Sequence, residues 1–202
     1  MTRFVVTGTD TGIGKTIFSA GLAQATGAPY WKPIQSGLEE ESDSEAVARL
    51  AGVPVLPEAY RLVTPASPHR AAEIDNVNID AETLTPPPGD LIVEGAGGAL
   101  VPVTRSTLYA DLFARWQIPV IVCARTALGT INHSLLTIEA LRSRNVPIHG
   151  LAFLGDAVED SEAIISEISG VQRLGRLPVI NPLTSANLAT AFKANFDLTD
   201  FH

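Results

Sequence analysis

Residues 4–16 read FVVTGTDTGIGKT, an apolar run followed by a glycine-rich segment that ends in Lys15 and Thr16. Residues 17–25 then read as a helix, so strand, loop and helix follow in the order that a phosphate-binding P-loop requires. Glycines let consecutive backbone N–H groups face one anion, and the positive end of the helix adds its attraction. Lys15 can reach the outer phosphates, and the Thr16 hydroxyl can ligate Mg²⁺. We therefore predict a nucleoside triphosphate site on residues 8–16.

The alternative is an ordinary glycine-rich turn, because the tripeptide Gly-Lys-Thr alone is weak evidence. Gly8 lies seven residues before Lys15, one more than the usual spacing, and Thr9 stands where a glycine is expected. The position of the segment between a strand and a helix nevertheless favours the P-loop.

Short, nearly uninterrupted apolar runs recur along the chain, at residues 4–6, 91–93, 120–123 and 148–154. Such runs are typical of parallel strands that are covered on both faces. Two sets of apolar residues fall on helical faces between them: Leu108, Leu112, Phe113 and Trp116, and Ile131, Leu135, Ile138 and Leu141. This alternation predicts an α/β fold of the three-layer P-loop type, with a mainly parallel central sheet and helices on both faces. The functional loops then meet at the carboxyl edge of the sheet.

One domain is the prediction for the whole chain, residues 1–202. Seven of the 14 prolines fall in a stretch of little periodicity, which we interpret as a loop-rich excursion at about residues 53–89. A domain linker is the competing interpretation, but strand candidates that need one common sheet flank the stretch. Residues 79–84 allow little more than one turn before three prolines, so we expect a thin flank there.

The composition excludes some classes of function. A formal net charge of -8, from 14 basic and 22 acidic residues, argues against general nucleic-acid binding. No stretch approaches the roughly 20 apolar residues that span a bilayer, so we expect no membrane span. Cys123 has no partner for an intrachain disulfide, and the N-terminus enters a strand without a signal-peptide pattern. A cytoplasmic protein is the expectation.

Three other charged residues are candidates for chemistry. Residues 90–98, DLIVEGAGG, place Glu94 at the end of a buried strand, where it can reach Mg²⁺; a solvated loop glutamate is the alternative. Asp43 precedes a helix predicted over residues 44–50, and its spacing alone favours an N-terminal cap. Lys32 lies near the carboxyl end of a second short strand predicted over residues 30–33, and a surface lysine is the preferred interpretation from the residue type alone.

Seven segments, taken together and in order, resemble the dethiobiotin synthetases: GTDTGIGKT, WKPIQSG, SDSEA, SPHRAAE, VEGAGG, LGTINHSLLTIEAL and GRLP. The resemblance extends from the first strand to about Ile180. Only the first segment is shared with many P-loop proteins. The lysine-proline element, VEGAGG and LGTINH are far more specific.

The resemblance implies an ATP-dependent cyclo-ligase of biotin biosynthesis. In that reaction 7,8-diaminononanoate takes up CO₂ as a carbamate, the carbamate is phosphorylated, and the neighbouring amine closes the cyclic urea. By resemblance, Thr16, Asp43 and Glu94 match the Mg²⁺ ligands or their close supports, which reverses the preference for Asp43 as a cap. Lys32 matches the catalytic lysine and acts with Lys15 on the carbamate and the transferred phosphoryl group.

The resemblance also distributes binding roles. Thr11, which is also placed among the catalytic residues, and Ser36 would position the diamine. The implied nucleotide-binding residues are Gly12, Ile13, Gly14, Lys15, Thr16, Asp43, Glu94, Gly95, Ala96, Gly97, Pro178 and Val179. The implied substrate-binding residues are Thr11, Lys32, Ser36, Gly129, Thr130, Ile131 and Asn132.

Residues 128–132 open a helix predicted over residues 131–144, and the free N–H groups there can bind a carboxylate. In the family this loop comes from the partner subunit and holds the carboxylate of the substrate. The resemblance therefore implies a homodimer with active sites at the interface.

Two positions depart from the family pattern. Gly12 stands where many relatives carry a glutamate that helps to hold the diamine. Residues 153–155, Phe-Leu-Gly, replace the asparagine that reads adenine in relatives, so we expect relaxed base selectivity in which CTP or GTP can substitute for ATP.

Two rival functions remain in view. One is a P-loop ATPase switch of the partitioning or metal-insertion type, but the loop of those proteins carries a lysine where this chain has Asp10. The other is an amidase-like ligase of cobyrinate type, which usually needs a longer chain.

Overall fold

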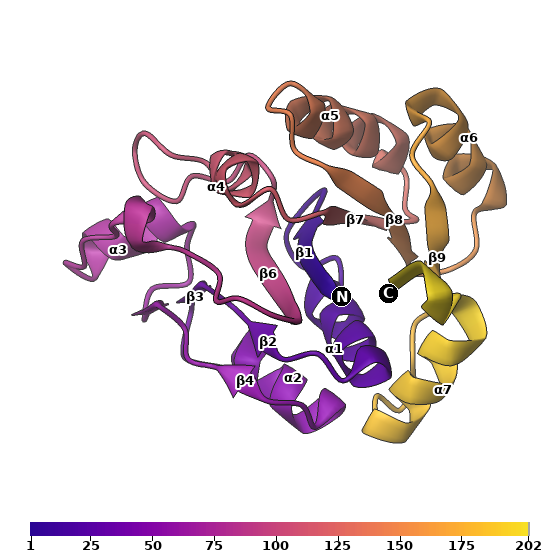
Figure 1. Cartoon of the computed structure of the whole chain (residues 1–202), viewed down its shortest axis with the longest axis horizontal. Coiled ribbons are helices and arrows are strands. Elements are labelled where there is room, and N and C mark those ends of the chain that lie inside the picture. The colour runs from indigo at the N-terminus through magenta and orange to yellow at the C-terminus, as the bar shows by residue number, and fades with distance from the viewer. Residues whose placement is uncertain (202) are drawn as a thin grey trace.

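Figure 1 shows the computed structural model of the chain, of which residues 1–201 are described. Seven strands form one sheet in the order β4-β2-β6-β1-β7-β8-β9, and every neighbouring pair is parallel. The strands are β1 (Arg3–Gly8), β2 (Tyr30–Trp31), β4 (Val55–Leu56), β6 (Leu91–Gly98), β7 (Val120–Arg125), β8 (Ile148–Leu154) and β9 (Arg173–Leu177). The predicted parallel sheet is confirmed.

Helices cover both faces of this sheet (Figure 1). One face carries α1 (Lys15–Thr26), α2 (Asp43–Ala51) and α7 (Ser185–Asn195), and the other carries α4 (Tyr109–Trp116), α5 (Thr130–Arg142) and α6 (Glu159–Ser169). Successive residues of β1 point to opposite faces, so that Val5 joins one buried cluster while Val6 joins the other. The three-layer prediction is confirmed.

The predicted strands and helices lie where the apolar patterns placed them, with ends that differ by a few residues. β6 is the main exception, because it continues past Val93 through the glycines to Gly98. Glycine carries no apolar signal, and the sequence pattern therefore stopped early. The central position of β1, between β6 and β7, places the P-loop at the middle of the carboxyl edge.

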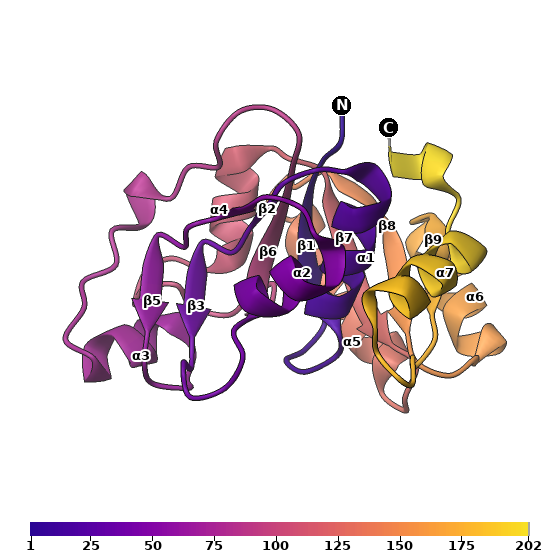
Figure 2. The same cartoon turned by 90° about the horizontal axis from the view of Figure 1, so that it is seen from below.

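Residues 53–89 contain more regular structure than the pattern indicated. β4 lies within them at the edge of the main sheet, and β5 (Tyr60–Leu62) pairs with β3 (Ile34–Ser36) in a separate two-stranded sheet. α3 (Pro68–Ile74) follows and lies beside that small sheet in Figure 2. Elements of two to seven residues are too short to show a period in the sequence. The thin flank before β6 is confirmed, since a single 3₁₀ turn, η1 (Ala81–Thr83), lies there.

β9, α6 and α7, for which the sequence analysis named no element, complete the sheet and its cover. Phe192 of α7 stacks on Phe196 and lies beside Phe18 of α1, with ring centroids 4.5 and 5.6 Å away. A final 3₁₀ turn, η2 (Leu198–Phe201), brings the two ends of the chain together, as Figures 1 and 2 show. Thr2 Oγ1 donates to the Phe201 carbonyl at 2.9 Å.

No helix within residues 1–201 is both long and apolar enough to cross a bilayer.

Candidate functional site

A cavity of about 700 Å³ opens at the carboxyl edge of the sheet, beside the start of α1. Eighteen residues line it: Thr11, Gly12, Gly14, Lys15, Thr16, Ile17, Lys32, Gln35, Ser36, Asp43, Pro65, Ala66, Ser67, Pro68, Glu94, Ala96, Gly97 and Val101. Residues from both ends of the stretch between Thr11 and Val101 thus meet in one space. Most of the residues that the sequence analysis singled out lie in this cavity.

The phosphate loop is open to an anion. Gly12 and Gly14 adopt positive φ angles of 68° and 99°, a backbone conformation that residues other than glycine rarely adopt. Gly14 caps α1 without any side-chain hydrogen bond, so the first N–H groups of the helix are free to bind phosphate. Ile13 turns away and is buried in the cluster beneath the loop.

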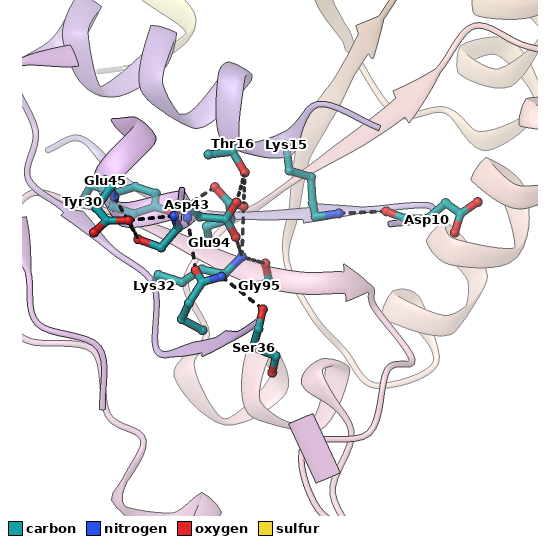
Figure 3. Close-up of polar contacts among 12 residues, drawn as sticks. Asp10, Lys15, Thr16, Tyr30, Lys32, Ser36, Asp43, Glu45, Glu94 and Gly95 are labelled. Atoms are coloured by element: carbon teal, nitrogen blue, oxygen red, sulfur yellow. Dashed lines mark hydrogen bonds and ion pairs between the residues drawn. The ribbon is translucent and has the colours of Figure 1, made fainter. Parts of the chain in front are cut away.

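Lys15 is almost fully buried, and its ammonium donates to the Asp10 carbonyl at 2.8 Å (Figure 3). Burial lowers the pKa of this lysine, an effect that neighbouring Glu94 partly offsets. Its donors are therefore held against the loop that a triphosphate would occupy.

Three oxygen-bearing side chains converge at the base of the cavity. Thr16 Oγ1 lies 2.7 Å from Asp43 Oδ1 and 3.0 Å from Glu94 Oε1. The Thr16 hydroxyl has one proton and can donate to only one of these carboxylates at a time. Oxygens of both carboxylates therefore face the Thr16 hydroxyl with acceptor capacity left over. Within residues 1–201 no cluster of three or more His, Cys, Asp or Glu side chains forms a metal site. Two carboxylates and a hydroxyl still suit Mg²⁺, which keeps several waters and shares substrate phosphates.

Lys32 lies between the same two carboxylates. Its ammonium is 2.6 Å from Asp43 Oδ2 and 3.1 Å from Glu94 Oε1, and it donates to the Gly95 carbonyl at 2.9 Å. Burial disfavours the charge, but Glu94 and Asp43 outweigh it and raise the pKa of Lys32 above its usual value. Only 3% of the side chain is exposed, so the interpretation as a surface lysine is wrong.

The register of the sheet explains this burial. β2 pairs with β6 so that Trp31 lies beside Val93, and continuing the register by one residue puts Lys32 beside Glu94. Both side chains therefore come from adjacent strands that each have a neighbour on both sides, a placement that residue type and local spacing cannot predict.

Asp43 is not the cap of its helix. Ser42 caps α2, because its Oγ accepts from Glu45 N at 3.3 Å while Glu45 accepts from Ser42 N at 2.8 Å. Asp43 is the first residue of the helix, and its carboxylate faces Thr16 and Lys32. Its neighbour Lys32 and these hydrogen bonds hold the pKa of Asp43 below its usual value although burial raises it.

The remaining predicted residues fall into two groups. Thr11 and Ser36 line the cavity with Gly97, whereas the 129–132 segment and the 178–179 segment do not. Gly129 caps α5, Thr130 is buried, and Ile131 and Asn132 are exposed at the start of the helix. Pro178 and Val179 follow β9, and 76% of Val179 is exposed.

A second hollow of about 350 Å³ adjoins the first and shares Thr11 and Val101 with it. Its other wall comes from α5, through His133, Leu136 and Thr137. Two of its lining residues, Leu100 and Leu136, are exposed apolar side chains, and Leu128 and Ile131, near the start of α5, are exposed as well.

Tyr30 and the segment 65–68 are components of the site that the sequence analysis gave no role. Tyr30 is fully buried, and its hydroxyl donates to Glu94 Oε2 at 3.0 Å. Burial, and then the charge of Glu94, raise the pKa of Tyr30 well above its usual value. A signal did exist, because Tyr30 precedes Lys32 by two residues and so shares its face of the strand.

Comparison with known proteins now adds to this geometry. A family model described as an AAA domain matches residues 2–187. The ATP-dependent dethiobiotin synthetase of Sphingopyxis alaskensis is 83% identical over the whole of both chains, and that of Novosphingobium aromaticivorans is 65% identical, also over the whole of both. The corresponding protein of Agrobacterium fabrum is 59% identical over 98% of this chain and 96% of its own.

The chain belongs to the dethiobiotin synthetase family.

Dethiobiotin synthetases share their fold with P-loop ATPases of other functions, as two solved structures illustrate. A ParA family ATPase from Chlorobium tepidum superposes with a TM-score of 0.53 and 10% identity, over 98% of this chain and 92% of its own. The cell division ATPase MinD of Pyrococcus furiosus does so with a TM-score of 0.54 and 13% identity, over 96% and 98%. At such identities the likeness shows the fold alone. The family prediction made from the seven segments is confirmed.

Proposed function

We propose that the protein is an ATP-dependent dethiobiotin synthetase, which closes 7,8-diaminononanoate and CO₂ into the cyclic urea of dethiobiotin in biotin biosynthesis. One observation carries this proposal: Lys32, a buried ammonium held by two carboxylates, shares a cavity with a P-loop. Close relatives named for this activity match the chain from end to end.

The triphosphate binds through the N–H groups of residues 12–16 and through Lys15. Lys15 leaves the Asp10 carbonyl for the outer phosphates, which are stronger acceptors because they are charged. Ala96 and Gly97, near the end of β6, line the same space, and the carbonyl of Gly95 accepts from the Lys32 ammonium. Cationic and backbone donors then surround the phosphoryl group before it moves.

Thr16, Asp43 and Glu94 would hold Mg²⁺. The ion, when bound, neutralises charge on the phosphate oxygens during transfer. Asp43 and Glu94 reach that position from α2 and β6, and Thr16 reaches it from the first turn of α1. Their oxygens already converge, so little reorganisation is needed.

The ring closes in three balanced steps. An amine of the diamine forms a C–N bond with CO₂ and loses a proton, which gives the carbamate. A carbamate oxygen takes the γ-phosphoryl group from ATP, and ADP leaves. The second amine then attacks the carbamate carbon, phosphate departs with the oxygen, and a proton is lost.

Lys32, Lys15 and Thr11 act on these steps as catalytic residues. Lys32 offsets negative charge on the carbamate and on the transferred group, because it stays protonated between its carboxylates. Thr11 and Ser36 both line this cavity, and they position the diamine. Gly12 offers no side chain there, and a Cβ at this position would meet nothing within 4 Å, so the chain lacks the glutamate contact that the resemblance assigns to many relatives.

We further propose a homodimer. Residues 129–132 lie outside the cavity, and Thr130 N there already donates to the Ala127 carbonyl at 3.1 Å. The other N–H groups of this segment bind the carboxylate of a substrate held in the cavity of the other subunit. The exposed Leu100 and Leu136 of the second hollow support such a contact, and so does Leu128, just before α5, which is completely exposed. CO₂ or bicarbonate and the diamine enter at this junction.

The nucleoside end of ATP lies toward Pro178 and Val179. Leu154 packs against Gly14, so the carboxyl end of β8 adjoins the phosphate loop on that side. Because no amide side chain stands at residues 153–155, CTP and GTP also serve as phosphoryl donors. The chain functions as one domain in the cytoplasm, and it binds neither nucleic acid nor membrane.

The test is mass-spectrometric detection of dethiobiotin from purified protein, diamine, bicarbonate and Mg²⁺, with ATP, CTP and GTP supplied in turn. We expect product with each nucleotide and one phosphate released per product. Rapid ATP hydrolysis without diamine and bicarbonate would instead support the switch-type ATPase.

A further inference from the structure

We propose that Tyr30 is a positioning residue that fixes Glu94 for the divalent cation. The inference rests on the proposed function only in that a cation binds at Glu94. It concerns a side chain that itself lies outside the cavity lining.

The two oxygens of Glu94 have separate partners (Figure 3). Oε2 accepts from the Tyr30 hydroxyl at 3.0 Å. Oε1 lies 3.0 Å from Thr16 Oγ1 and 3.1 Å from the Lys32 ammonium. Oε2 is thus engaged by Tyr30, which does not line the cavity, whereas Oε1 lies beside Thr16 and Lys32, which do.

The hydrogen bond is well placed to set this orientation. Tyr30 and Glu94 are both completely buried, so no water competes for the carboxylate oxygen. Tyr30 stands on β2 beside Ile92, two residues before Glu94 on the neighbouring strand. A rigid aromatic ring anchored in the sheet therefore limits rotation of the Glu94 carboxylate.

Partners of metal-ligating carboxylates matter for binding. Loss of such an outer hydrogen bond typically costs tenfold to a hundredfold in metal affinity or activity. Without its hydroxyl donor, Glu94 would turn Oε2 toward Lys32 or Thr16, and the direction of Oε1 would no longer be fixed.

The chain contains a matched control. Tyr109 is likewise buried, at 1% exposure, and its hydroxyl has no hydrogen-bond partner among residues 1–201. Tyr109→Phe therefore removes a buried hydroxyl without removing a bond. Tyr30→Phe removes the same atom together with the contact to Glu94.

The experiment measures binding of a non-hydrolysable ATP analogue by calorimetry, first in EDTA and then across a Mg²⁺ titration. For Tyr30→Phe we expect the Mg²⁺ concentration of half-maximal effect to rise about tenfold to a hundredfold, with affinity in EDTA within about twofold of wild type. Tyr109→Phe should stay within about twofold in both. In turnover, the KM for Mg²⁺ should rise in Tyr30→Phe, and kcat should recover at saturating Mg²⁺.

Unchanged Mg²⁺ dependence in Tyr30→Phe would overturn the proposal, and so would an equal shift in Tyr109→Phe. Failure of Tyr30→Phe to fold while Tyr109→Phe folds would also overturn it, since the hydroxyl would then be a structural requirement. The binding readout needs no diamine. A wild type that binds the Mg²⁺ complex but makes no dethiobiotin would therefore refute the proposed reaction and leave the Tyr30 inference standing.

Discussion

The carboxyl edge of the sheet and the cluster of aromatic rings around the chain ends are buried in opposite ways. At the carboxyl edge the buried side chains are charged: Lys15, Lys32 and Glu94 are at most 6% exposed. The aromatic cluster consists of Phe4, Phe18, Phe192, Phe196 and Phe201, whose neighbouring ring centroids are 4.5 to 6.4 Å apart. One region holds charge away from water, and the other holds apolar surface away from water.

The difference separates function from stability. Burying ions is costly unless they are paired, so we expect the charged group at the carboxyl edge to add little net stability, and in the proposed function it supplies the chemistry. Buried aromatic rings contribute strongly to folding and carry no reactive group. Substitutions in the two regions should therefore affect different measurements.

Phe192→Ala should have the largest effect, because it empties the centre of the aromatic cluster. Phe192 is completely buried and lies near Phe18, Phe196 and Phe201. We expect the free energy of unfolding, measured by urea denaturation, to fall by about 3–5 kcal/mol. The kcat of the remaining folded protein at low temperature should not change. A loss of kcat with little loss of stability would break the comparison.

Lys32→Met tests the charged region. Removing a positioned donor to the transition state should lower kcat about 10²–10³-fold. Lys193→Met, at an exposed position of α7, is the control and should retain wild-type kcat. Dethiobiotin formation under saturating substrates measures both variants. Near-normal turnover in Lys32→Met would remove the lysine from the mechanism.

Ser42→Ala should have a smaller effect that sharpens the comparison. It removes the cap of α2, which carries Asp43, and should lower the free energy of unfolding by about 1 kcal/mol. Thr184→Ala removes the equivalent cap of α7, where Thr184 Oγ1 accepts from Asn187 N at 3.2 Å, and neither residue lines the cavity. Thermal melts should show similar losses, while the KM for Mg²⁺ should rise only in Ser42→Ala. Equal KM values in the two variants would contradict a link between the cap and Asp43.

The smallest effect should come from pH at the aromatic cluster. His149 lies 4.5 Å from Phe4 and 6.1 Å from Phe201, ring centroid to ring centroid. Burial lowers the pKa of His149, and Asp200, the charged group facing it, opposes this only in part. The folded state then binds the proton less readily than the unfolded state. The contribution of neutral His149 to the free energy of unfolding is therefore present above the ordinary histidine pKa and is lost as pH falls below it.

Urea denaturation at pH 7.5 and 5.5 measures this pH-dependent contribution of His149 to the free energy of unfolding. Wild type should lose slightly more stability on acidification than His149→Gln, which cannot titrate. A greater loss in the variant would reverse the assigned sign.

The sequence was sufficient for the main fold and for the phosphate loop. Apolar runs such as residues 148–154 predict buried strands directly, because continuous hydrophobicity is what a two-sided strand requires. Two-residue strands such as β4 are too short to show a period in the sequence. The packing of α7 depends on aromatic residues that contact α1 in the folded chain, and local sequence does not show that contact. Those elements depend on tertiary contacts that a local pattern does not contain.

The charged centre of the site shows the same limit. Residue type and spacing favoured a surface role for Lys32 and a cap for Asp43, and both interpretations are wrong. Their burial follows from the register of β2 on β6 and from the approach of α2 to α1, two long-range pairings. Resemblance to the dethiobiotin synthetases supplied what spacing could not.

A crystal structure with Mg²⁺ and a non-hydrolysable ATP analogue tests the central claim most directly. We predict the triphosphate on residues 12–16, the ion at Thr16, Asp43 and Glu94, and the Lys32 ammonium within hydrogen-bonding distance of the terminal phosphate. A triphosphate bound elsewhere, or Lys32 turned into solvent away from it, would contradict the account.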